Sequence, residues 1–89
     1  MDSALRVWWI PQLGMKEVFH VSVTTIKEAA LIINTLAQYD LFQLEHNIKP
    51  DYSNVGGLET LDENAEWIEW ENEEGEDIMQ VAKTLGYKV

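Results

Sequence analysis

The sequence predicts an α+β fold of order ββαββα, in which a four-stranded, mainly antiparallel sheet carries a long helix on one face and a short helix at the C-terminus. Two runs of alternating apolar and polar side chains near the N-terminus predict a pair of strands. A capped segment of helical periodicity follows from Thr25, and a second one runs from Asp77 to Gly86. Packing a helix across one face of a sheet is the simplest way for both to bury their apolar sides.

The length and composition predict a single domain over residues 1–89. A chain of 89 residues can build one compact core and little more. The apolar content of 46% is typical of globular proteins, and the absence of cysteine excludes a disulfide framework or a thiolate nucleophile. The N-terminal residues lack the basic and long apolar segments of a signal peptide, so we expect a soluble cytoplasmic protein.

The N-terminal third predicts a β-hairpin. Leu5–Ile10 is rich in β-branched and aromatic residues and precedes a turn signal at Pro11–Gly14. Lys16–Val23 alternates, with Phe19, Val21 and Val23 on one face and Val18, His20 and Ser22 on the other. The two runs should therefore pair as antiparallel strands.

The next segment predicts the long helix. Thr25 and Glu28 have the spacing of a capping box, and an apolar stripe recurs at helical spacing through Ile26, Ala29, Ala30, Ile33, Leu36 and Ala37. The helix should end near Tyr39–Asp40. Leu41–Ile48 is compatible with either a further helical turn or an irregular connector.

The second half predicts two strands and a short helix. A turn-rich segment over 49–54, prolonged by Val55–Gly57, should lead into a strand at Leu58–Leu61. The two adjacent glycines should either bend the chain sharply or let another backbone come close. A turn at 62–64, a strand at Ala65–Glu71 and a turn at 72–75 follow. Asp77 can cap the last helix, and Gly86 is a natural C′ residue. In a strand, Trp67 and Trp70 point to opposite faces, so one should be buried and the other available for contact.

The net charge of −10 excludes several classes of partner. With six Lys and Arg against sixteen Asp and Glu, the chain cannot bind nucleic acid or an anionic membrane through an extensive basic surface. The charge is instead compatible with simple solubility or with a basic protein partner. Ten of the sixteen acidic residues lie between Glu59 and Asp77, a stretch with two of the four tryptophans and no Lys or Arg.

This stretch is the candidate protein-interaction site, because tryptophan surrounded by charge is typical of binding hot spots. We call it the acidic surface, and it comprises Glu66, Trp67, Glu69, Trp70, Glu71, Glu73 and Glu74. A sheet with a helix on only one face also leaves aromatic groups on the other face, which a second copy of the chain can close in a symmetric homodimer.

No pattern in the sequence indicates catalysis, a cofactor or a metal. His20 and His46 lie far apart, and no residues match zinc-binding spacings. Counting back from Gly75 places Trp70 at the first ligand position of an EF-hand loop, which excludes that calcium motif. The solvated carboxylates share one environment, whereas acid–base catalysis requires carboxyl groups with different pKa values. We therefore expect a non-enzymatic protein.

Four stretches that together span Arg6 to Ile78 read RVWWIPQ, AQYDLFQ, IKPDYSN followed by VGGLE, and EWIEW followed by ENEEGEDI. They resemble segments of a group of small proteins from tailed phages, some of which are described as superinfection-exclusion proteins. The resemblance implies a phage accessory protein that acts in the host cytoplasm on the host or on rival phage. It brings no catalytic residues with it.

Three non-enzymatic functions compete at this point, and an enzyme such as a metal-dependent hydrolase is a fourth, less favoured alternative. The first is a phage accessory protein that binds and modulates a protein partner through the acidic surface. The second is a DNA mimic, whose carboxylates replace phosphates in the basic groove of a host defence protein. The third is a structural or assembly protein of the virion.

Overall fold

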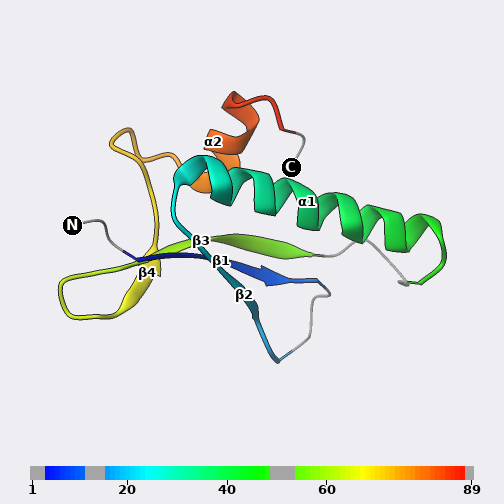
Figure 1. The fold of residues 1–89 in the computed structure, drawn as a ribbon, viewed down its shortest axis with the longest axis horizontal. Helices are drawn as coiled ribbons and strands as arrows, with labels where there is room; N and C mark the ends of the chain where they lie inside the picture. The colour runs from blue at the N-terminus through cyan, green and yellow to red at the C-terminus, as the bar shows by residue number, and fades with distance from the viewer. Residues whose placement is uncertain (1–3, 12–15, 49–53, 88–89) are drawn as a thin grey trace.

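The computed structural model describes residues 4–11, 16–48 and 54–87. Its elements follow the predicted order ββαββα (Figure 1). The elements are β1 (Leu5–Ile10), β2 (Phe19–Val23), α1 (Ile26–Glu45), β3 (Val55–Leu61), β4 (Trp67–Glu69) and α2 (Ile78–Thr84). The predicted fold class is thereby confirmed.

The four strands form one antiparallel sheet of order β2-β1-β3-β4. The register places Val7 of β1 opposite Val21 of β2 on one side and opposite Leu58 of β3 on the other. Both helices lie on the same side of the sheet (Figure 1). In the described part of the chain the opposite side carries no helix, and we call it the open face.

The core lies between the sheet and the two helices. Val7, Val23 and Leu58 project from the strands onto the small inner face of α1, where Ala29 and Ala30 are fully buried. The predicted helical stripe is therefore the buried face of α1. Among the described residues, the buried apolar side chains are those of Val7, Trp9, Val23, Ala29, Ala30, Ile33, Ala37, Leu58, Ile78 and Ala82.

Two adjacent tryptophans pack against two adjacent glycines at the centre of the sheet. Trp8 lies opposite Gly57 and Trp9 opposite Gly56 in the β1–β3 register. A Cβ on Gly56 would lie 2.1 Å from Cε3 of Trp9, and a Cβ on Gly57 would lie 2.7 Å from Nε1 of Trp8. The prediction of a prolonged turn at Val55–Gly57 is therefore wrong: β3 begins at Val55, and its glycines provide room for the two indole rings.

The buried carboxylate of Asp40 connects α1 to the sheet. The side chain is 3% exposed, and its Oδ2 accepts hydrogen bonds from Trp9 Nε1 and from Asn54 Nδ2, both at 2.9 Å. A buried charged group is tolerated only when such donors replace water. Asp40 therefore fixes the position of the Trp9 ring relative to α1.

The helix α1 continues past its predicted end at Tyr39–Asp40. Thr25 caps its first turn by accepting a hydrogen bond from the Glu28 amide at 3.0 Å, as predicted. Its C-terminus closes at Asn47, which has a φ of 59° and forms the backbone hydrogen bonds of a Schellman motif together with Ile48. The ambiguity over Leu41–Ile48 is resolved, because Leu41–Glu45 is helical.

The remaining differences concern element ends. β2 begins at Phe19 instead of Lys16, and β4 covers Trp67–Glu69 within the predicted Ala65–Glu71. The predicted caps of α2 are confirmed at Asp77 and Gly86. Most of the predicted turns at 11–14 and 49–54 lies outside the described residues.

Candidate functional site

The acidic stretch folds into two successive hairpin turns that project from the same end of the molecule (Figure 1). The first turn joins β3 to β4. The side chain of Asp62 accepts hydrogen bonds from the amides of Asn64 at 2.8 Å and Glu66 at 3.0 Å. The Asp62 amide in turn donates to the Glu66 carbonyl at 2.9 Å, and the Ala65 amide donates to the Asp62 carbonyl at 3.1 Å.

The second turn repeats this hydrogen-bond pattern ten residues later. The side-chain oxygen of Asn72 accepts hydrogen bonds from the amides of Glu74 and Glu76, both at 2.9 Å. The Asn72 amide donates to the Glu76 carbonyl at 2.9 Å, and the Gly75 amide donates to the Asn72 carbonyl at 3.0 Å. The segments DENAE and NEEGE are therefore two copies of one loop.

Two positions set the geometry of each loop. The first is the Asp or Asn whose side chain mimics a backbone turn. The second is the residue three positions later, which takes a positive φ: 60° at Ala65 and 79° at Gly75. The residues between these two positions are directed to solvent, so the acidic residues there do not determine the shape of the loop.

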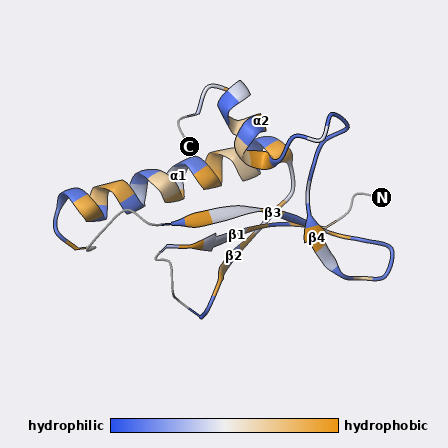
Figure 2. Ribbon diagram, turned by 180° about the vertical axis from the view of Figure 1, so that it is seen from behind, coloured by the Kyte–Doolittle hydropathy of each residue, from blue (hydrophilic) through white to orange (hydrophobic). Residues whose placement is uncertain are grey.

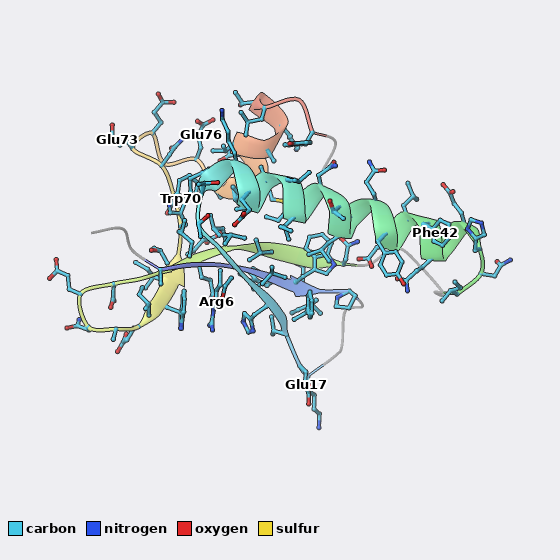
Figure 3. All side chains as sticks on the ribbon, viewed as in Figure 1. Arg6, Glu17, Phe42, Trp70, Glu73 and Glu76 are labelled. Carbon is cyan, nitrogen blue, oxygen red and sulfur yellow. The ribbon has the colours of Figure 1, made fainter. Side chains whose placement is uncertain are left out.

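The acidic side chains of the surface are exposed and unneutralised. Glu66, Glu69, Glu71, Glu73 and Glu74 are all exposed. Among the described residues, the only ion-pair contacts involve Glu59, which is bonded to Arg6 and approached by His20. The two turns are strongly hydrophilic along their length (Figure 2), and Figure 3 shows Glu73 projecting from the second turn. This end of the molecule therefore carries a concentrated negative potential.

Trp67 belongs to the open face. The guanidinium carbon of Arg6 lies 3.9 Å from the centroid of the Trp67 ring, and the Nε of Arg6 donates to Oε1 of Glu59 at 2.8 Å. Nε2 of His20 lies 3.9 Å from the same oxygen. The half-buried Trp67 ring is thus held by a cation–π contact and remains partly open to solvent.

Trp70 lies on the opposite side of the sheet. Its amide donates to the Leu58 carbonyl at 2.8 Å, and its half-buried ring packs against the core beside the start of α1 (Figure 3). The two tryptophans therefore point to opposite faces, as the strand alternation predicts. Neither is fully buried and neither is fully exposed, so the expected division into one buried and one available ring is only approximate.

The sequence reasoning predicted aromatic groups on a face without a helix, but not the charged residues that lie beside them there. The open face brings together Arg6, Trp8, His20, Glu59 and Trp67 from four different strands. These residues meet only because of the strand order and register. No local pattern in the sequence signals their proximity.

The described part of the chain contains neither a metal-binding cluster nor a helix fit to span a membrane. Within residues 4–11, 16–48 and 54–87, no group of three or more His, Cys, Asp or Glu is arranged to hold a metal ion. Over the same residues, neither helix combines the length and apolar character that crossing a membrane requires. The expectation of a non-enzymatic protein stays a prediction.

Comparisons with known proteins match almost the whole chain. A family model described as superinfection exclusion gene product 17 matches residues 4–86. The chain is 42% identical over 81 residues to the superinfection exclusion protein of Salmonella phage P22, with 78% of this chain and 78% of that protein covered. No solved structure matches significantly. The resemblance drawn from the sequence is confirmed, and the chain belongs to the superinfection exclusion gene product 17 family of phage proteins.

Proposed function

We propose that this superinfection exclusion protein acts in the host cytoplasm without catalysis, by binding a protein that has a basic surface. The contact is made by the acidic surface. The observation that carries the proposal is the presentation of its glutamates on two structured turns, exposed and unpaired among the described residues.

A high density of charges of one sign is energetically unfavourable in a folded protein. Like charges that lie close together repel one another and destabilise the folded chain. Ten carboxylates between residues 59 and 77 raise this cost, and Arg6, which pairs with Glu59, is the only described Lys or Arg that forms an ion pair there. A partner with complementary charge relieves the repulsion, and the same field accelerates its association.

The turns also favour binding because they are ordered before any partner arrives. Each turn is fixed by two hydrogen bonds to an Asp or Asn side chain and by backbone hydrogen bonds. A preordered loop loses less conformational entropy on binding than a disordered acidic segment does. Trp67, which is half-exposed beside the first turn, adds apolar and aromatic contact area.

The test is superinfection exclusion itself, measured as the plating efficiency of a challenging phage on cells that express the protein. Replacing Glu69, Glu71, Glu73 and Glu74 with Gln should abolish exclusion and reduce recovery of the partner from host lysate. The double replacement Glu73→Gln with Glu74→Gln removes only two charges, so it can be compared with a control that removes two charges elsewhere.

The control replaces Glu17 and Glu45, which are exposed and remote from the turns, with Gln. It changes the net charge equally and should leave exclusion intact. Recovery of the partner by the native protein should also fall as salt rises, because exposed charges are screened. Full exclusion and full partner recovery by the fourfold Gln variant, expressed at the native level, would contradict the proposal.

A further inference from the structure

The sheet has two edges of opposite character. One edge is β4, which is three residues long, ends in Glu69 and has Glu66 before it and Glu71 shortly after it. The other edge is β2, which hydrogen-bonds to β1 alone among the described strands. Natural proteins usually protect such an edge with Lys, Pro, a bulge or a covering segment. The β2 sequence FHVSV contains no Lys, Arg, Asp, Glu or Pro, so none of the side-chain devices is present.

The side chains along β2 are also unusually exposed for their type. Phe19 is 54% exposed although it lies on the helix-bearing side of the sheet, and the neighbouring Val18 is 38% exposed. Val21 is only half-buried on the same side. Apolar groups therefore continue along this edge up to the point where the sheet stops.

We infer that two copies of the chain associate through antiparallel pairing of their β2 strands about a two-fold axis at Val21. In this register Phe19 lies opposite Val23 of the second copy, His20 lies opposite Ser22, and Val21 lies opposite Val21. Aromatic and β-branched residues form favourable cross-strand pairs, and no like charges oppose each other. The β2 sequence is thus complementary to itself, which is the requirement of a two-fold interface.

The charge distribution supports a second copy of the chain as the occupant of this edge. The paired sheet has the strand order β4-β3-β1-β2-β2-β1-β3-β4, and its two acidic edges are separated by seven strand spacings, or roughly 34 Å. The screening length at physiological salt is about 8 Å. Two chains of net charge −10 can therefore associate through β2 with little repulsion between their acidic turns. Pairing through β4 would instead bring the glutamates of both copies together.

This inference is independent of the proposed partner, and it is tested on the purified protein. Sedimentation velocity should show a concentration-dependent species of twice the 10.3 kDa of one chain. Phe19→Glu should raise the dimer dissociation constant by at least about tenfold, because it removes both aromatic pairs and adds a carboxylate to the interface. The matched control is Phe42→Glu, which changes a 49% exposed aromatic on α1 by the same charge and should leave the dimer intact.

A second measurement does not depend on how well the Phe19 variant folds. Because the chain contains no cysteine, Ser22→Cys introduces a single thiol beside the proposed axis, at a diagonal position roughly 7–8 Å from its copy. A short bis-maleimide should link two such chains efficiently, and it should not link chains that carry Gln38→Cys on the exposed side of α1. A native protein that stays monomeric overturns the inference. So does a dimer that is insensitive to Phe19→Glu and unlinked through Ser22→Cys.

Discussion

The paired glycines and tryptophans allow two neighbouring substitutions to be compared directly. Gly56→Ala and Gly57→Ala add the same methyl group at adjacent positions of β3. The Gly56 methyl group would lie 2.1 Å from Cε3 of Trp9, 2.7 Å from Cζ3, and 2.8 Å from the Trp8 carbonyl oxygen. The Gly57 methyl group would lie 2.7 Å from Nε1 and about 3.1 Å from Cε2 of Trp8. Both contacts are too short, so in each variant some atoms must move.

The loss of stability in each variant depends on whether the indole ring that clashes with the new methyl group can move. Trp9 is 2% exposed and is bound to Asp40, so it cannot rotate away without breaking a buried hydrogen bond to a charged group. Overpacking costs about 1–3 kcal/mol, and disrupting a charged hydrogen bond costs about 1.5–3 kcal/mol. We therefore expect Gly56→Ala to destabilise the fold by about 3 kcal/mol or more.

Gly57→Ala should cost much less. The Trp8 ring lies on the open face and is only half-buried, so it can turn toward solvent. Alanine also loses less backbone entropy than glycine in a strand, which returns about 0.5–1 kcal/mol. The net change should stay within about 1 kcal/mol of the native protein.

Urea unfolding followed by far-ultraviolet circular dichroism measures both changes without depending on indole fluorescence. At roughly 0.05–0.15 kcal/mol per residue, an 89-residue domain has a total stability of about 4–13 kcal/mol. Gly56→Ala should remove a large part of it. Equal losses in the two variants would refute the reasoning, because they would show that the mobility of the clashing ring does not set the cost.

Three further predictions follow from the turns, the buried carboxylate and the second helix. Because Ala65 has a φ of 60°, Ala65→Gly should stabilise the fold by about 0.5–1 kcal/mol and raise the melting temperature by a few degrees. Gly75→Ala should lower the melting temperature, since Gly75 also has a positive φ. Shifts of the same sign in the two variants would contradict this role of the positive φ. Asp40→Ala leaves the buried Trp9 donor without its partner and should lower the free energy of unfolding in urea by about 2–3 kcal/mol. A loss below about 1 kcal/mol would argue against the stabilising role of this hydrogen bond. Asp77→Ala removes a hydrogen bond at the start of α2 and should cost about 1 kcal/mol, with Asp77→Asn as a control that keeps the cap.

Local patterns in the sequence were sufficient to predict most of the fold. Thr25 and Asp77 mark helix starts, and Gly86 marks a helix end, because capping depends on residues close in sequence. The end of α1 was missed although Asn47 is a local signal: asparagine is one of the few residues besides glycine that readily takes a positive φ.

The errors and omissions arise where a residue acts through distant neighbours. Considered alone, Gly56 and Gly57 predict either a sharp bend or the close approach of another backbone, and only the cross-strand position of Trp8 and Trp9 explains them as strand residues. The contact between Arg6 and Trp67 depends on two strand registers together, so a single sequence does not reveal it. The concentration of acidic residues is evident from the sequence, but their organisation on two equivalent loops is seen only in the hydrogen bonds.

In each of the two loops, the residues that determine the backbone shape differ from those that present side chains to solvent. The backbone path depends on Asp62 and Asn72 and on the positive φ three residues later. The intervening tip positions, Glu63–Asn64 and Glu73–Glu74, contribute backbone amides alone to those hydrogen bonds. Their side chains are therefore replaceable without altering the loops. Point mutations at these positions can thus change the charge that this end of the protein displays while the fold remains constant.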